Sequence, residues 1–471
     1  MKRIKYYLAA LVTSVMLLSS CSDSFFNVNT DPNNPAVSTP TYVLPSAISG
    51  SAYVMGGYYQ ALGGFWSQQY GQASGASQWI EWESYNLTED GFDRQFSTIY
   101  SGSLEDYENV RVSSAATANW KFYTIATLMQ AYTFQVMADL YDQVPFTEAL
   151  KGLNNLQPKY DKGELVYDSL LARIDVAISK DFSAPSAQAP GNADVIFGGD
   201  MKSWIQFANT LKLKIYLRYV NVDANLPNGN RYNDKMVALL AENNFLTSDA
   251  KFTAFKDETT GGNPFWNTFG DRLSGNVVAN NTMINFLNDN NDPRISKLYN
   301  AAATGGQFLG IDTGDSKNNP SLTISNYATP TLLSDHTAPV YFFSKEEALF
   351  LIAEAQFRTG NTGSAATAFN DGIKASLVSL NLSDTAKRYT FDGTIKSIII
   401  QKWVAATNKR SLESFFDYNR TGYPDNFAKS KTSVLNDNDR PKRLFFPSSE
   451  RKSNANTPKK VALTVPVWWA K

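Results

Sequence analysis

The sequence is short of the residues that most catalytic and metal sites require. Its 471 residues hold one cysteine, Cys21, and one histidine, His336. With a single cysteine, neither an intrachain disulfide nor a zinc site of the Cys/His type has the residues it needs. A Ser-His-Asp triad would depend on His336, and the G-x-S-x-G elbow is absent from the sequence. We therefore interpret His336 as an ordinary loop residue.

Other catalytic signatures are missing too. Glycoside hydrolysis needs only two carboxylates, but nothing marks a pair among the 44 acidic residues, and Glu81 and Glu83, which flank Trp82, belong to no known motif. Residues 288–294, NDNNDPR, place proline and arginine where an EF-hand loop needs a ligand and glycine. No glycine-rich phosphate-binding loop follows a strand. We expect a protein that is not an enzyme and that uses no cofactor and no catalytic metal ion. The sequence leaves open a structural metal ion bound by backbone carbonyls and scattered Asp or Asn side chains.

Charge is scarce and balanced, whereas aromatic residues are abundant. Charged residues make up 18% of the chain and aromatic residues 13%. The chain has 43 basic and 44 acidic residues. This balance gives no reason to expect nucleic acid or an acidic membrane surface as a partner.

Residues 1–20 have the pattern of a secretory signal peptide. Basic residues precede an apolar run over residues 8–18, which is too short to span a bilayer. The run leads into LSSC, which resembles a bacterial lipobox, the signal whose cysteine is acylated. Cys21 is the only cysteine and lies at the one position that lipidation needs. We expect a lipid anchor there, and an ordinary signal peptide is the alternative.

Residues 21–45 are dense in Pro, Asn, Asp and Ser, a composition that favours turns and extended chain over helix. We interpret them as a lipidated tether that leads to one globular domain over residues 46–471. The alternative is that Phe25 and Phe26 pin this segment along the globular body.

The globular part is mainly helical by its periodicity. Apolar residues recur every three or four positions over 125–140, 166–178 and 204–219, and each series forms one apolar stripe. Pro145 is expected to end the first helix. The third helix also carries a basic cluster, which we interpret as its solvated face: Lys212, Lys214 and Arg218.

The clearest helix start lies in residues 344–361, SKEEALFLIAEAQFRTGN. Ser344 and Glu347 have the spacing of a capping box, and Gly360 suits the left-handed end of the helix. A second apolar stripe follows at once over residues 365–373. Two such helices joined by a tight glycine turn are typical of a tetratricopeptide hairpin. Only residues 460–469, KVALTVPVWW, alternate like a short strand.

Several longer segments carry a resemblance to a known family. Taken in order, they make the chain similar to SusD/RagB outer-membrane nutrient-binding lipoproteins, closest to the SusD-like subgroup associated with starch binding. The resemblance runs nearly end to end and rests on these segments: NVNTDPNNP, MQAYTFQVMADLYDQVPFTEAL, LQPKYDKGELVYDSLLARIDVAI, WIQFANTLKLKIYLRYV, NDPRISKLY, FFSKEEALFLIAEAQFRTGN, IIIQKWVAATNKRSLESFFDYNRTGYP and PKRLFFPSSERKSNANTP.

The resemblance implies a mainly α fold. Tetratricopeptide-like helix pairs would form a right-handed α-superhelical scaffold, with a loop-rich remainder and a few short strands. It also implies a lipoprotein held in the outer membrane through acylated Cys21, facing the cell exterior. Such a protein captures an oligomeric nutrient and closes over a SusC-type TonB-dependent β-barrel transporter, without chemistry on the ligand.

Two polar, aromatic-rich segments are candidate ligand sites, because rings stack on sugar faces while amides and carboxylates bond hydroxyls. The first is GGFWSQQYGQASGASQWIEWESY, residues 63–85; alternatively, its rings belong to the core. The second is a glycine-rich loop over residues 263–272. We interpret Trp468 and Trp469 as packing residues. The candidates are Trp66, Tyr70, Trp79, Trp82, Tyr85, Asn263, Phe265, Trp266, Asp271 and Arg272.

Three hypotheses about function remain at this point. In the first, the ligand is a glycan, which the aromatic and amide-rich loops support. In the second, the protein caps the same kind of transporter but binds a peptide. The third is a structural lipoprotein without its own ligand, whose aromatic residues form an interface.

Overall fold

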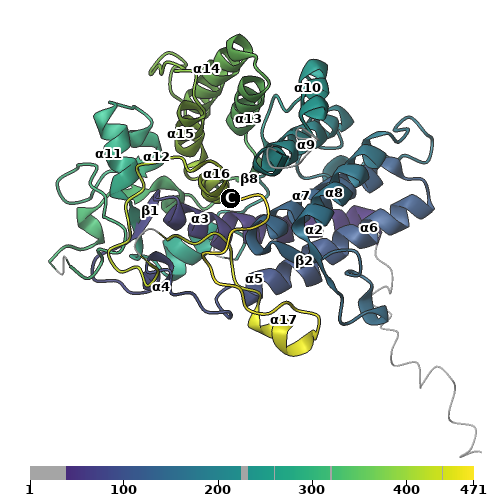
Figure 1. The fold of residues 1–471 in the computed structure, drawn as a ribbon, viewed down its shortest axis with the longest axis horizontal. Coiled ribbons are helices and arrows are strands. Elements are labelled where there is room, and N and C mark those ends of the chain that lie inside the picture. Colours follow the sequence, from purple (N-terminus) through teal and green to yellow (C-terminus); the bar gives the residue numbers. More distant parts are fainter. Residues whose placement is uncertain (1–38, 224–231, 259, 319–320, 437–438, 471) are drawn as a thin grey trace, which may run out of the picture.

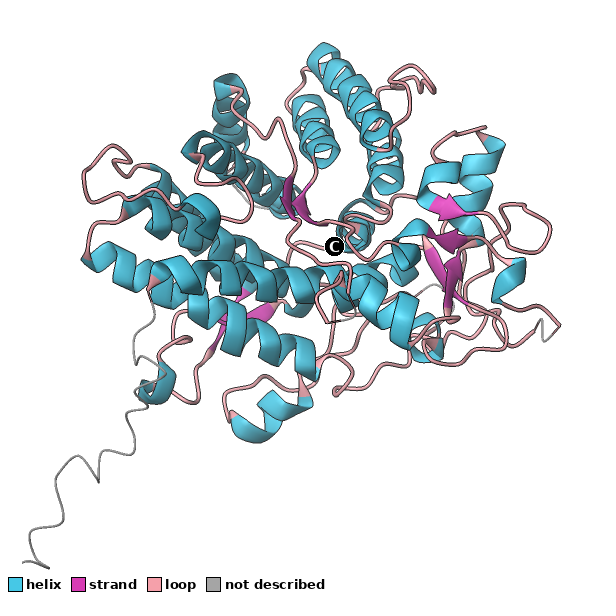
Figure 2. Ribbon diagram, turned by 180° about the vertical axis from the view of Figure 1, so that it is seen from behind, coloured by secondary structure: helices cyan, strands magenta, loops and turns pink. Residues whose placement is uncertain are grey.

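Helices are the main secondary structure of the molecule in this computed structural model (Figures 1 and 2). The structure describes residues 39–223, 232–258, 260–318, 321–436 and 439–470. The α-helices are α2 (Pro40–Val54), α3 (Gln60–Trp66), α4 (Ile80–Glu83), α5 (Asp93–Thr98), α6 (Glu105–Ala116), α7 (Trp120–Tyr141), α8 (Gly163–Ile178), α9 (Met201–Asp223), α10 (Asn233–Glu242), α11 (Asn281–Asp289), α12 (Ile295–Leu298), α13 (Lys345–Arg358), α14 (Thr362–Ser379), α15 (Ile395–Ala406), α16 (Ser411–Thr421) and α17 (Ser448–Ser453).

The strands are short and form antiparallel two-stranded ribbons between the helices. The pairs are β1 (Tyr70–Gln72) with β5 (Val277–Ala279), β2 (Gln143–Pro145) with β3 (Tyr160–Lys162), β4 (Ala250–Phe252) with β8 (Val340–Phe343), and β6 (Tyr299–Asn300) with β7 (Thr329–Pro330). The predicted strand at residues 460–469 is wrong, because these residues form turns. Trp469 is fully buried there, as a packing residue would be.

Among the described residues, three segments form wider π-helical turns. The π-helix η2 (Met55–Tyr59) joins α2 to α3, and η3 (Ile99–Leu104) joins α5 to α6. The third, η6 (Trp266–Arg272), stands in a loop. Short 3-10 turns complete the chain: η4 (Gly152–Asn154), η5 (Gly191–Ala193), η7 (Ile324–Asn326) and η8 (Thr331–Ser334).

The first described helix begins earlier than the predicted tether allows. Residues 40–45 belong to α2 rather than to an extended segment. Pro40 occupies the first turn, where its missing N–H removes no helical hydrogen bond. Pro45 does remove one, but the helix buries Leu44 and Ile48 completely, and this packing outweighs the loss. Cys21 and most of the predicted tether lie outside the described residues.

The long predicted helices are present where the apolar periodicity placed them. Residues 125–140 lie in α7, 166–178 in α8 and 204–219 in α9. Asp142, which follows α7, has a φ of 67°, and β2 carries Pro145 beyond it. Among the described residues, no helix is long and apolar enough to cross a membrane.

The helices α13 and α14 form the expected tetratricopeptide-like pair, seen at the top of Figure 1. Ser344 caps α13 by accepting a hydrogen bond from the Glu347 backbone at 3.1 Å. The Glu347 side chain does not complete a capping box, because it accepts a hydrogen bond from Arg410 at 3.0 Å. Gly360 lies in the turn between α13 and α14 and has the left-handed φ of 85° that was expected at the end of the helix.

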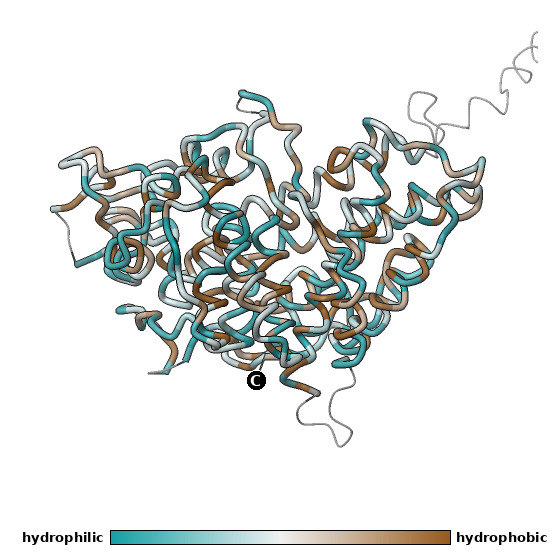
Figure 3. Tube along the Cα trace, turned by 90° about the horizontal axis from the view of Figure 1, so that it is seen from above, coloured by the Kyte–Doolittle hydropathy of each residue, from teal (hydrophilic) through white to brown (hydrophobic). Residues whose placement is uncertain are grey.

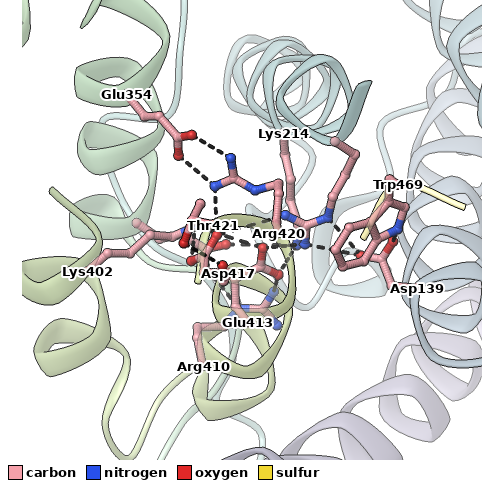
Figure 4. Close-up of polar contacts among 12 residues, drawn as sticks. Asp139, Lys214, Glu354, Lys402, Arg410, Glu413, Asp417, Arg420, Thr421 and Trp469 are labelled. Atoms are coloured by element: carbon pink, nitrogen blue, oxygen red, sulfur yellow. Dashed lines mark hydrogen bonds and ion pairs between the residues drawn. The ribbon is translucent and has the colours of Figure 1, made fainter. Parts of the chain in front are cut away.

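The helix α16 runs through the centre of the molecule (Figure 1) and carries charged residues in a buried position. Its Glu413 lies 2.6 Å from Arg218 and 2.5 Å from Lys214, and Asp417 lies 2.8 Å from Lys402 (Figure 4). Burial alone would raise the pKa of Glu413, but these cations hold it well below its usual range. Hydrophilic and hydrophobic residues alternate along the trace (Figure 3).

The buried charges correct the prediction of a solvated basic face on α9. Lys214 and Arg218 are 0% exposed, and Lys212 pairs with Asp175 at 2.6 Å near the surface. Arg218 reaches Asp139 of α7 at 3.1 Å as well as Glu413 of α16. These ion pairs therefore join helices that are far apart in the sequence.

Candidate functional site

The five aromatic residues predicted from residues 63–85 lie in the hydrophobic core. Each exposes 6% of its surface or less. The Trp79 and Trp82 rings are 4.5 Å apart, and Trp66 Nε1 donates to the Trp82 carbonyl at 3.1 Å. These rings present no open face to a sugar, so the structure corrects the expected binding surface and favours the core alternative. The residues are Trp66, Tyr70, Trp79, Trp82 and Tyr85.

Glycines in this segment allow close packing rather than exposure. A Cβ on Gly63 would lie 2.2 Å from the backbone nitrogen of Leu412 in α16. A Cβ on Gly64 would lie 2.0 Å from the ring of Tyr70. The glycines let α3 approach its neighbours more closely than any larger residue could.

Glutamines in the same segment form hydrogen bonds inside the protein. Gln69 donates to the Trp403 carbonyl at 3.0 Å, and the Gln72 side chain accepts from the Trp79 backbone at 2.7 Å. A composition typical of a surface is thus used for interior packing, because both glutamine side chains form hydrogen bonds there.

Glu83 lies beneath the aromatic cluster as a buried carboxylate. It accepts backbone hydrogen bonds from Gln72 at 2.9 Å and from Gly314 at 3.0 Å, and so ties β1 to a distant loop. Burial raises the pKa of Glu83 to about 8. Glu81 is exposed, so the two carboxylates do not form a pair.

Asn263 and Phe265 of the second predicted site are buried and position the loop. Asn263 Nδ2 donates to the Ala338 carbonyl at 2.7 Å. Its Oδ1 accepts from the backbone N–H of Phe265 at 2.8 Å and of Trp266 at 3.2 Å. These bonds fix the start of η6 against residues 336–338. Asn263 and Phe265 are therefore supports rather than ligand contacts.

Trp266 lies partly exposed at the start of η6 and stacks on His336. The two ring centroids are 3.9 Å apart with an interplanar angle of 33°. His336 Nδ1 lies 2.5 Å from Asp257 Oδ1, and the two side chains are 40% and 79% exposed. His336 is thus part of an aromatic pair, although the sequence indicated only a loop residue. Its partner Trp266 lies 70 positions away in the chain, so no local pattern could reveal the contact.

The other end of η6 adds charge and a further ring. Asp271 and Arg272 are exposed. Tyr58 of η2 packs with its ring centroid 5.7 Å from that of Phe269. Burial raises the pKa of Tyr58, and the positive charge of Arg272 opposes the shift. We call this partly exposed set the η6 surface: Tyr58, Asp257, Trp266, Asp271, Arg272 and His336.

A small cavity lies next to residues 331–341, the segment that carries His336. Its volume is about 190 Å³, and Leu332, Asp335 and Ala338 line it from the same segment that carries His336. Among the described residues, no group of three His, Cys, Asp or Glu side chains is placed to hold a metal ion. The η6 surface offers rings, carboxylates and a guanidinium, which suit binding by stacking and hydrogen bonds.

Solved structures share this fold over nearly their whole length. A chitin-binding protein has a TM-score of 0.75 and 20% identity, covering 92% of this chain and 100% of its own. A SusD homologue from Bacteroides uniformis has a TM-score of 0.77 and 22% identity, covering 91% of this chain and 99% of its own. A chitin-binding SusD homologue from Flavobacterium johnsoniae has a TM-score of 0.72 and 21% identity, covering 92% of this chain and 97% of its own. No protein of curated function matches the sequence.

The sequence profile of one family matches residues 32–447, which is most of the chain. That family is described as "Starch-binding associating with outer membrane". The match begins before the first described helix and ends within the segment that precedes α17. This protein therefore belongs to the SusD-like family of starch-binding proteins that associate with the outer membrane.

Proposed function

We propose that this protein is a surface lipoprotein that captures an oligomeric glycan and passes it to a SusC-type TonB-dependent transporter. Membership of the SusD-like family supports a glycan as the ligand and the outer membrane as the location. Two structural neighbours are themselves named as chitin-binding, which supports the same ligand class. The anchor is acylated Cys21, which lies outside the described residues.

The observation that carries the proposal is the stacked pair of Trp266 and His336. A partly exposed ring gives an apolar face for the C–H side of a sugar. Asp257, which pairs with His336, and the exposed Asp271 and Arg272 at the other end of η6 supply groups that bond hydroxyls. Asn263 fixes the loop through three hydrogen bonds, so little conformational freedom is lost on binding.

Calorimetry on the protein with Cys21→Ser tests the ligand class. The panel holds maltooligosaccharides, chitooligosaccharides and short peptides of mixed sequence. We expect one glycan series to bind, and Trp266→Ala to weaken it by about tenfold, as loss of a stacking ring costs about 1–1.5 kcal/mol. Trp120→Ala is the matched control, because Trp120 is also half-buried but lies at the start of α7.

The same panel separates the alternatives. Binding of peptides alone would replace the glycan with a peptide in the same role. Binding of neither class would favour a structural lipoprotein. The transporter part is tested by purifying the lipidated protein from its own outer membranes, where a large β-barrel protein should accompany it.

A further inference from the structure

A second cavity lies far from the η6 surface in the sequence, between α14 and the segment that follows it. Its volume is about 540 Å³. One wall is a single face of α14, formed by Ala366, Asn370, Ile373 and Lys374 at helical spacing. The opposite wall is residues 384–391. We call this space the α14 cavity.

Anchors on both sides of Arg388 hold the opposite wall in place. The Lys387 ammonium donates to the Asn290 carbonyl, and the Tyr389 hydroxyl donates to Asp292 Oδ2 at 2.7 Å. Phe391 packs with its ring 5.5 Å from Phe369 of α14. The segment is therefore a fixed wall.

Arg388 itself lines the α14 cavity and is exposed. Within the described part of the chain it has no ion pair or hydrogen bond, whereas the buried arginines such as Arg218 and Arg420 are paired. Lys374 faces the same space, and its 3.5 Å pair with Asp371 lies in solvent, where such pairs contribute little. The lining of the α14 cavity thus holds three cations, Lys374, Lys387 and Arg388, and one carboxylate, Asp384.

The rest of the lining suits a sugar ring. Tyr389 and Phe391 supply apolar faces, while Asn370, Thr385 and Thr390 supply groups that bond hydroxyls. A guanidinium binds a carboxylate through two parallel hydrogen bonds, which an ammonium cannot match. A neighbouring cavity of about 590 Å³ shares Lys374 and Asp384, but Asp249, Glu346 and Asp371 also line it, so the excess of positive charge belongs to the α14 cavity.

We infer that the α14 cavity is a binding site for an acidic oligosaccharide, whose uronate carboxylate pairs with Arg388 and Lys374. This site is separate from the η6 surface and does not depend on it. The aromatic and hydroxyl lining favours a sugar over an acidic peptide. The protein would then hold glycan at two places that differ in charge.

Calorimetry with a galacturonate trimer tests the inference, with its fully methyl-esterified form as the neutral counterpart. We expect the acid to bind at low salt at least tenfold more tightly than the ester. Arg388→Gln should remove that preference for the acid. Addition of 0.5 M NaCl should also weaken the preference, because salt screens charges that are partly exposed to solvent. Lys202→Gln, at an exposed lysine on α9, is the control.

Two further comparisons make the outcome decisive. Trp266→Ala should leave the affinity for the galacturonate trimer unchanged. The test of the α14 cavity therefore stands even if the η6 surface proves not to bind glycan. Equal affinity for the acid and the ester, or unchanged binding in Arg388→Gln, would overturn the inference. Tighter binding of a triglutamate peptide than of the trimer would also overturn it. Circular dichroism confirms that each variant is folded.

Discussion

Residues 63–85 and residues 263–272 look alike in sequence, but their tryptophans lie in different environments. Both combine aromatic residues with Gly and polar side chains. The tryptophans of the first segment are buried, with Trp79 and Trp82 in direct ring contact. In the second, Trp266 stacks on His336 at the surface. Exposure is decided by the partner elements, not by the local composition.

The difference lies in what covers each ring. α16 packs on α3 so closely that Gly63 meets the backbone of Leu412. Trp266 packs against the side chain of a loop residue, His336, and stays partly exposed. A ring enclosed by helices stabilises the fold, and a ring held by a loop is free to bind ligand.

The largest expected effect is on stability in the buried segment. Trp82→Ala should destabilise the protein by about 3–5 kcal/mol, because it leaves a large cavity in the core. Trp266→Ala should cost about 1 kcal/mol, since the ring is only partly buried. Urea unfolding followed by circular dichroism measures both. If the two variants lost similar amounts of unfolding free energy, Trp82 and Trp266 would not differ in burial as described.

The buried carboxylate beneath the first segment should make stability depend on pH. Burial raises the pKa of Glu83 from 4.5 to about 8, so the folded protein holds a proton that the unfolded chain releases. Stability should therefore fall as the pH rises from about 4.5 to about 8. Glu83→Gln should reduce this fall in urea unfolding at several pH values. Glu81→Gln is the exposed control, and an equal effect from it would contradict the assignment.

A smaller effect should distinguish a packed glycine from an open one. Gly64→Ala should cost about 1–3 kcal/mol, because its Cβ would meet the Tyr70 ring at 2.0 Å. Gly102→Ala in η3 meets nothing within 4 Å and should gain up to about 1 kcal/mol. Thermal unfolding compares the two. Tolerance of Gly64→Ala would mean that α3 is packed less tightly than the structure shows.

Much of the fold is predictable because its signals are local. The apolar stripes of α7, α8 and α9 and the Ser344 cap all lie within a few turns of chain. The family resemblance supplied the helical architecture, and the family match agrees with it.

The failures share a long-range cause. Lys214 and Arg218 look like a solvated face because their partner Glu413 lies about two hundred residues further along the chain. The helix over residues 40–45 depends on burial of Leu44 against distant elements. Likewise, His336 acquires significance only through Trp266 and Asp257. None of these contacts leaves a pattern in the neighbouring sequence.

A structure of the protein with the tightest-binding oligosaccharide of the calorimetry panel tests the central claim most directly. The account predicts a sugar ring stacked on Trp266 with carbon atoms about 4 Å from the indole, the usual van der Waals separation. It also predicts hydroxyls bonded to Asp257, Asp271 or Arg272. A neutral sugar bound elsewhere, with Trp266 and His336 uncovered, would contradict the claim that the η6 surface captures the ligand.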